Sequence, residues 1–313
     1  MKLSIIVCTR NRAYAITPCL DSIAEALANA APVDAEIIVI DNRSEDNTHA
    51  VVQEWAARCA YPVRLLLGHN RGLSAGRNHG IRSSQGDLIA FTDDDCRLGK
   101  DYVKNLLRHD ANDTDLVLRG GRIELGDPND LPVTIKTSMQ GQRWHLQSAP
   151  KKSSGFSGTI SGCNMVMRRK MAQAIGFFDE NFGAGTIIPG ADDTDYIVRA
   201  YLASIAVEYA PDMMIFHHHG RRTESQGKRL MRGYMVGTGA LCTKYLFNNP
   251  SLCRRDRSED SDETSANPHQ RQAFDLSQAD KLFHCARGAV TYLFVRLRNM
   301  VLSRQSVMVK QQG

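Results

Sequence analysis

Long apolar runs are absent from this sequence of 313 residues. No stretch of about 18 uncharged apolar residues occurs, which argues against a membrane-spanning helix. The apolar stretch before Thr9 and Arg10 is only about five residues long, whereas a secretory signal needs a longer one. We therefore expect a cytoplasmic protein whose membrane contact, where it has one, is peripheral and at the inner face.

Motifs of several common protein classes are absent as well. The cysteines at positions 8, 19, 59, 96, 163, 242, 253 and 285 form no C-x-x-C pair, so we expect reduced, mostly buried thiols instead of a zinc array. No G-x-G-x-x-G follows the first predicted strand, where Cys8–Arg12 stands, and no P-loop motif occurs. These absences argue against a nicotinamide dehydrogenase and a P-loop kinase. A net charge of +5 is too small to predict a nucleic-acid partner.

What the sequence does contain is a regular alternation of strand and helix patterns over its first 95 residues. Continuous apolar, β-branched runs predict buried strands, and apolar residues at helical spacing predict helices between them. The predicted strands are 3–8, 36–40, 63–67 and 87–92, and the predicted helices are 16–27, 49–59 and 73–83. This order is typical of a doubly wound α/β sheet.

The pattern becomes less regular after residue 95. We expect a strand pair at 116–125, an active-site excursion at 126–157, a strand at 160–167, a helix at 192–203 and a strand at 213–217. These elements complete a first domain, residues 1–224. We expect residues 225–313 to form a helical C-terminal extension with a helix at 230–247 and a flexible acidic loop at 254–270.

The segment 281–304 is basic, contains no acidic residue and interleaves its charges with leucine and phenylalanine. A basic amphipathic helix of this kind can lie on an anionic membrane surface. It can equally pack its apolar side on the domain. The sequence leaves both interpretations open.

Carboxylates stand where two of the predicted strands end. Asp41 follows the second strand, as a ligand for a nucleoside or as an ordinary turn or capping residue. Asp93, Asp94 and Asp95 follow the fourth strand, and their mutual repulsion must be relieved by protonation, solvent or a cation. Because residues i and i+2 share a strand face, Asp93 and Asp95 can hold one Mg²⁺ or Mn²⁺. The alternative is a solvated acidic loop.

Two later groups also carry candidate side chains. Asp192 and Asp193 begin a predicted helix, whose dipole favours a charged, proton-accepting carboxylate; the alternative is a simple helix cap. His217, His218 and His219 end the last predicted strand, with His217 and His219 on one face. This triplet is either a metal ligand set, with His217 as the first choice, or a solvated strand end.

Seven blocks of the sequence together resemble the nucleotide-sugar glycosyltransferases of family 2, which have the GT-A fold. The blocks are SIIVCTRNR, VIDNRSED, NRGLSAGRNHG, FTDDDC, GCNMVMRR, GFFDENFGAG and GADDTDYIVRA. Their order and spacing are more specific than any single block, and the resemblance covers about residues 2–219. It implies a GT-A (Rossmann-like) mixed sheet flanked by helices.

The resemblance also implies roles for individual residues. Thr9, Arg10, Asn11, Asp41, Arg77, Asp93 and Asp94 fall where the family binds the nucleotide sugar. Asp93 and Asp95 match the outer acids of its D-x-D motif and, with His217, would hold the metal. Gly162 and Asn164 match the block that borders the donor sugar and the acceptor. Asp193 matches the catalytic base, and Asp192 replaces the glutamate that usually precedes it.

The reaction implied by the resemblance is a metal-dependent transfer with Mn²⁺ or Mg²⁺ as cofactor. A sugar would be transferred from a nucleoside diphosphate donor to a hydroxyl of a glycan or lipid-linked acceptor, with inversion at the anomeric carbon. UDP is the favoured nucleotide of the donor. Two alternatives stay open. A sugar-phosphate nucleotidyltransferase would use a similar acidic site, but Cys8–Arg12 lacks the glycine-rich loop of such enzymes. A non-catalytic membrane-surface binding module would retain the acids without turnover.

Overall fold

The computed structural model describes residues 1–68, 70–145, 158–246, 249 and 274–310, with side chains as far as residue 301. Its strands are β1 Leu3–Thr9, β2 Ala35–Asp41, β3 Val63–Leu67, β4 Leu88–Asp93, β5 Cys96–Leu98, β6 Val117–Leu125, β7 Gln142–Trp144, β8 Asn164–Arg168 and β9 Ala206–His217. Its helices are α1 Ile16–Asn29, α2 Thr48–Ala56, α3 Leu73–Ser83, α4 Tyr102–Ala111, α6 Lys170–Ile175, α7 Asp192–Leu202, α8 Glu224–Tyr245 and α10 Gln278–Lys310. The strands form one sheet in the order β3-β2-β1-β4-β8-β6-β9-β5, and β7 also pairs with β9.

The first four strands are parallel, as the alternating pattern predicts. The register pairs Thr9 with Asp41 and Cys8 with Asp93, so the carboxyl ends of β1, β2 and β4 meet at one edge. Every residue of β2 is buried, which explains why its sequence is a continuous apolar run and not an alternating one. The doubly wound arrangement of the first 95 residues is confirmed.

The second half of the sheet is mixed and differs in detail from the prediction. β8 is antiparallel to β4, and β6 is parallel to β9. The strand pair expected at 116–125 is wrong: these residues form the single strand β6, which is irregular between Gly121 and Ile123. β8 begins only at Asn164, β9 begins seven residues earlier than expected, and the sequence patterns did not predict β5, β7, α4 or α6.

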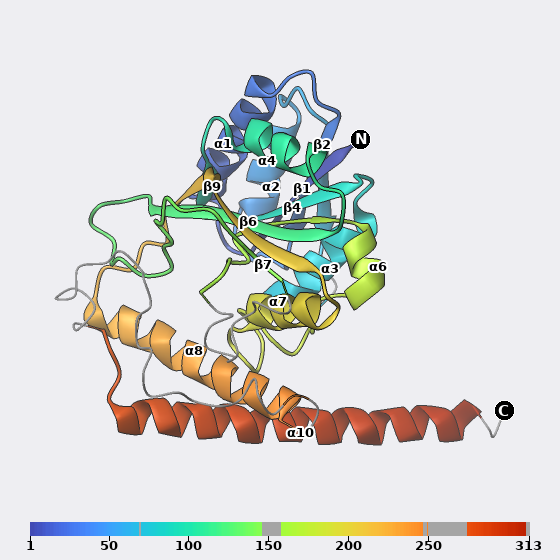
Figure 1. Cartoon of the computed structure of the whole chain (residues 1–313), viewed down its shortest axis with the longest axis vertical. Coiled ribbons are helices and arrows are strands. Elements are labelled where there is room, and N and C mark those ends of the chain that lie inside the picture. Colours follow the sequence, from blue (N-terminus) through green and yellow to red (C-terminus); the bar gives the residue numbers. More distant parts are fainter. Residues whose placement is uncertain (69, 146–157, 247–248, 250–273, 311–313) are drawn as a thin grey trace.

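Helices cover both faces of the sheet (Figure 1). Buried side chains of α1, α2 and α4 pack with one face in one apolar core. Side chains of α3, α6, α7 and α8 pack with the other face in a second core. The sheet is therefore apolar on both sides, and its polar functional groups can gather only at the strand ends.

The C-terminal part consists mainly of α8 and the long helix α10, which runs along the edge of the molecule and extends beyond α8 (Figure 1). α8 begins six residues before the prediction because Thr223 and Gln226 form a reciprocal capping box. The two helices approach closely where Gly239 faces Cys285 and Gly288 faces Val236. A Cβ atom on Gly239 would lie 1.9 Å from the Cys285 carbonyl oxygen, and one on Gly288 would lie 2.0 Å from that of Val236. The loop expected at 254–270 lies outside the described residues.

None of the described helices is both long and apolar enough to cross a bilayer.

Candidate active site

The nucleoside-binding candidates Thr9 and Asp41 lie side by side at the ends of β1 and β2, where they are register partners. Both side chains are buried. One carboxylate oxygen of Asp41 accepts a hydrogen bond from the Ser44 N–H at 2.8 Å, and the other lies 3.3 Å from Nδ1 of His49. The carboxylate is thereby held in one orientation at the carboxyl end of β2.

Arg10 and Asn11 lie in the loop that follows β1. Asn11 adopts a left-handed conformation, with φ of 54°. Its N–H donates to the Ser44 hydroxyl at 2.9 Å, and its side-chain oxygen accepts from the Glu45 N–H at 2.7 Å. Arg10 is exposed and lies 3.4 Å from the Glu45 carboxylate. Asn11 therefore fastens the β1 loop to the β2 loop, while Arg10 remains at the rim.

The charge of the aspartate triplet is relieved in two of the ways that the sequence analysis named. Arg12 lies 3.3 Å from both Asp94 and Asp95. Burial raises the pKa of Asp94 to about 7 despite this arginine. Burial also opposes the charge of Asp95, but a hydrogen bond with His217 and the nearby Arg12 lower its pKa overall. Asp94 thus tends toward protonation, and Asp95 is held as a carboxylate.

Arg77 joins Asp93 at the end of β4 to Asp192 at the start of α7. The arginine is only 3% exposed, and its guanidinium lies 3.2 Å from Asp93 and 2.5 Å from Asp192. Gly162 covers the same guanidinium so closely that a Cβ atom there would lie 2.8 Å from both terminal nitrogens. Burial raises the pKa of Asp192 to about 6, although Arg77 opposes the shift. Arg77 is therefore the centre around which the site is assembled.

Asp193 lies next to the group formed by Arg77, Asp192 and Gly162. It is half-buried, one of its oxygens accepts the Gly162 N–H at 3.1 Å, and the other accepts the Thr194 N–H at 2.7 Å. The helix cap itself is Ala191, in a left-handed conformation with φ of 61°. Asp193 is therefore not the cap but a first-turn carboxylate at the positive end of the helix dipole.

The histidine triplet divides into different environments. His217 Nε2 lies 3.3 Å from the Asp95 carboxylate, and its Nδ1 lies 3.1 Å from the Thr134 hydroxyl. Burial disfavours the charged ring, but the hydrogen bond with Asp95 raises the pKa of His217 to about 9. His219 instead uses both ring nitrogens on the backbone of Leu131 and Arg221. Of these two, only His217 reaches the acidic triplet.

The donors available to a divalent cation are Asp93, Asp95 and His217. They do not form a closed cage. Within the part of the chain that the structure describes, the only three ligand atoms lying within 4.8 Å of one another belong to Cys96, Cys163 and His217. An incomplete oxygen set nevertheless fits Mg²⁺ or Mn²⁺, which proteins commonly bind through one or two carboxylates together with substrate phosphates. A cavity of about 160 Å³ is lined by Asp94, Asp95 and their neighbours, but not by Asp93.

Asn164 has a structural environment that differs from its expected role. Its side chain is fully buried. Its oxygen accepts from the Tyr102 hydroxyl at 2.9 Å, and its amide nitrogen donates to the carbonyls of Met213 and Arg122. Because both ends of the amide bond within the protein, we assign Asn164 to the junction of β8, α4 and β9. Its expected place beside the donor sugar and the acceptor stays a prediction.

Two residues of this region were not singled out by the sequence analysis. Arg12 contacts the acidic triplet, and His49 contacts Asp41. Arg12 could have been found, because a cation is one way to relieve the repulsion of three adjacent carboxylates and the TRNR block supplies one. His49 gave no such signal, since its contact with Asp41 depends on how α2 packs.

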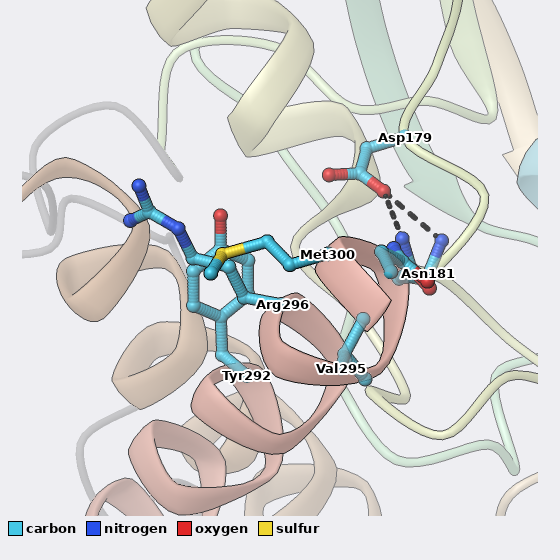
Figure 2. A pocket seen from close by; sticks show the side chains of 7 residues that line it. Asp179, Asn181, Tyr292, Val295, Arg296 and Met300 are labelled. Carbon is cyan, nitrogen blue, oxygen red and sulfur yellow. Dashed lines mark hydrogen bonds between the residues drawn. The ribbon is translucent and has the colours of Figure 1, made fainter. Parts of the chain in front are cut away.

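A second cavity, of about 280 Å³, lies where the segment before α7 meets α10. Figure 2 shows Asp179 hydrogen-bonded to Asn181 on one side and Tyr292, Arg296 and Met300 of α10 on the other. Lys244 of α8 holds Asp179 at 2.7 Å. The cavity therefore lies between helix α10 and the loop that leads to Asp192.

Comparison with known proteins places this geometry in a family. Residues 4–176 match the family described as Glycosyl transferase family 2. The EpsH protein of Bacillus subtilis (strain 168) is 30% identical over 177 residues, which cover 55% of this chain and 48% of EpsH. The succinoglycan biosynthesis protein ExoM of Rhizobium meliloti (strain 1021) is 26% identical over 226 residues, 69% of this chain and 66% of ExoM. The chain thus spans about half the length of EpsH.

Solved structures agree on the fold. S. aureus TarS 1-349 in complex with UDP has a TM-score of 0.54 and 18% identity, covering 93% of this chain and 89% of that one. The mannosyltransferase PcManGT from Pyrobaculum calidifontis, in complex with GDP-Man and Mn²⁺, has a TM-score of 0.56 and 17% identity, covering 98% and 79%. Because the family model matches more than half of the residues of this chain, and the fold is GT-A, the chain belongs to glycosyl transferase family 2.

Proposed function

We propose that the chain transfers a sugar from a nucleoside diphosphate sugar to an acceptor hydroxyl. The observation that carries this proposal is the chain of contacts Asp93–Arg77–Asp192, with Asp193 held on the Gly162 N–H beside it. It brings a donor-side carboxylate and a base-side carboxylate to one arginine. Membership of a glycosyltransferase family favours this reaction over the nucleotidyltransferase and non-catalytic alternatives.

On the donor side, the buried ends of β1 and β2 would receive the nucleoside. The Asp41 carboxylate would accept hydrogen bonds from the base or the ribose, next to Thr9. Asn42, the residue that follows Asp41, offers a buried side-chain oxygen that has no hydrogen-bond partner among the described residues. A buried oxygen without a donor is costly, and a bound nucleoside can supply one.

Asp93 and Asp95, with His217, would hold the Mn²⁺ or Mg²⁺ that neutralises the charge on the departing diphosphate. Arg12 would have to yield its contact with Asp95 when the cation and the diphosphate arrive. The exposed Arg10 at the rim would add positive charge for the diphosphate. Asp94, buried against Arg12, would orient that arginine.

On the acceptor side, Asp193 would remove the proton from the attacking hydroxyl. Its two hydrogen bonds, from the N–H groups of Gly162 and Thr194, fix the orientation of the carboxylate. Direct attack assisted by one base needs no covalent intermediate, so the anomeric centre would invert. Asp192, paired with Arg77, would position this helix turn and not take the proton itself.

The donor proposed here carries uridine, and the acceptor is a glycan or a lipid-linked glycan of a cell-envelope polysaccharide. Support comes from relatives: TarS structures contain UDP or UDP-GlcNAc, and ExoM is named for succinoglycan biosynthesis. PcManGT contains GDP-Man, so a guanosine donor is the competitor that the first experiment must include.

Membrane contact is also part of the proposal. One side of α10 packs on α8, while Phe283, Val290 and Leu297 on its outer side are 65%, 67% and 60% exposed. Arg287 and Arg298 lie on the same outer side. The packing alternative named from the sequence therefore accounts for only one side of the helix. The outer side, apolar and basic, suits an anionic leaflet.

Thermal unfolding with UDP, GDP and ADP, each with and without Mn²⁺, tests the donor. A ligand that binds only the native state raises the midpoint, and we expect the largest rise for UDP with Mn²⁺. A rise with GDP alone would replace the uridine assignment, and no rise with any of them would contradict the proposal. Product anomers from the matching nucleotide sugar then test inversion.

Co-sedimentation with vesicles tests the membrane contact. We expect binding to vesicles rich in anionic lipid and little binding to neutral ones. Replacing Phe294 and Leu297 with serine should abolish that binding, whereas the same change at exposed Leu67 of β3 should not. Equal binding to both kinds of vesicle, or none, would contradict it.

A further inference from the structure

Three buried side chains beside the donor site form a second ligand set, of which the proposed reaction uses only His217. The sulfur atoms of Cys96 and Cys163 and a ring nitrogen of His217 all lie within 4.8 Å of one another. Cys96 and His217 are direct partners across β5 and β9, so their side chains share one face. Cys163 precedes β8. Three separate segments therefore bring these atoms together, and all three residues are buried.

The chemistry of this set differs from that of the acidic triplet. Thiolate and imidazole ligands suit Zn²⁺, whereas Mg²⁺ and Mn²⁺ prefer oxygen. Ligand atoms around a tetrahedral zinc ion are about 3.3 to 3.8 Å apart at zinc–ligand distances of about 2.0 to 2.3 Å. Movements of about 1 Å or less would close the set.

A fourth ligand is at hand. The Asp95 carboxylate lies 3.9 Å from the Cys96 sulfur and 3.3 Å from Nε2 of His217. The cavity lined by Asp94 and Asp95 also has Cys96 among its lining residues. Cys96 and His217 thus lie between two sites of different preference, one formed mainly by oxygen and one mainly by sulfur.

We propose that Cys96, Cys163 and His217 form a binding site for a thiophilic divalent cation, with Zn²⁺ as the first candidate. On binding, the two thiols and the His217 ring each release a proton to water, so that two Zn–S bonds and one Zn–N bond form. The ion takes His217, and in the four-ligand form Asp95, away from the donor site. Resting on the function proposed above, the consequence is that Zn²⁺ inhibits transfer, while the site itself is independent of that function.

Direct binding is tested on the full chain with Co²⁺ as a spectroscopic substitute for Zn²⁺. We expect a sulfur-to-cobalt charge-transfer band that Zn²⁺ removes, while circular dichroism shows that the protein stays folded. Cys163→Ser should weaken Zn²⁺ binding by more than about 100-fold, the upper range for loss of a supporting contact. Cys59→Ser, a thiol change outside the cluster, should leave binding within about twofold.

A Cys96→Ala variant gives an independent test if Cys163→Ser does not fold. Absence of the charge-transfer band in the wild type would overturn the proposal, as would a band that both cluster variants retain. Neither readout requires transferase activity, so a failure here is distinct from a failure of the proposed function.

Inhibition is measured separately, with Zn²⁺ added to enzyme that contains saturating Mn²⁺. The wild type and Cys59→Ser should lose transfer at the Zn²⁺ concentration that fills the cobalt-responsive site, and Cys163→Ser should keep it to at least tenfold higher Zn²⁺. Equal inhibition of all three proteins by Zn²⁺ would contradict the proposal that both metal sites share His217, while leaving the binding result intact.

Discussion

The two halves of the sheet are built by different means. The parallel strands β1 to β4 are held by continuous apolar contacts, and they present Thr9, Asp41 and Asp93 at their ends. The mixed half, from β5 to β9, contains a buried ion network in which Arg119 contacts Asp113 and Glu208. The first half presents the donor-side groups, and the second presents Gly162 and His217, with Asp193 on a helix packed against it.

The difference shows why the site depends on long-range charge pairs. Arg77 comes from the first half, and its partner Asp192 lies 115 residues later. Apolar strands can be aligned by local periodicity, but the two sides of the site are joined by one buried guanidinium. Changes on the second side should therefore affect chemistry, and changes at the junction should affect both chemistry and folding.

The largest effect is expected at Asp193. Asp193→Asn keeps the shape of the side chain but removes the base, so the transfer rate should fall by about 10²–10⁴-fold, or about 3–5 kcal/mol of barrier. Initial rates with donor and acceptor in excess measure it. Asp34→Asn makes the same charge change at an exposed site and should have no effect. Full activity in Asp193→Asn would refute its role.

The junction is tested at Arg77. Arg77→Met leaves the Asp93 and Asp192 carboxylates in a buried site without their cation, which should lower the free energy of unfolding by about 3–5 kcal/mol. Arg77→Lys should recover only part, because one ammonium group does not span two carboxylates as a guanidinium does. Denaturant unfolding measures both, with Arg10→Met as the exposed control. Equal stability of Arg77→Met and wild type would contradict the bridge.

The ion network of the second half should respond less strongly. In Arg119→Met the carboxylates of Asp113 and Glu208 lose one arginine but keep Arg143, at 2.9 and 2.6 Å. We therefore expect a loss of about 1.5–3 kcal/mol, measured by the same unfolding curves. A loss as large as that of Arg77→Met would show that the two halves do not differ as described.

The smallest effect concerns pH. Burial opposes the charge of Glu208, but the adjacent Arg119 and Arg143 lower its pKa overall. A lowered folded-state pKa stabilises the protein above the unfolded-state value and loses that contribution as the pH falls through the folded-state value. Below about pH 5 the wild type should therefore lose stability more steeply than Glu208→Gln, with Glu54→Gln as an exposed control. Parallel pH profiles would argue against the network.

The same division explains which features could be predicted from the sequence. Buried parallel strands leave continuous apolar runs, so β1 to β4 and the polar residues at their ends are visible in the sequence. A strand pair was expected at 116–125, where the structure has the single strand β6. Gly120 and Gly121 of β6 are required by close contacts with Ile160 and Met213, which no local pattern reveals. The internal hydrogen bonds of Asn164 are likewise a product of distant packing.

The most direct test of the account is a calorimetric titration of UDP, with Mn²⁺ present, into Asp95→Asn and Asp193→Asn side by side. If Asp95 serves the donor and Asp193 takes the acceptor proton, Asp193→Asn binds UDP within about threefold of the wild type, and Asp95→Asn loses the Mn²⁺-dependent part of the affinity. Equal loss in both variants, or loss only in Asp193→Asn, would contradict it.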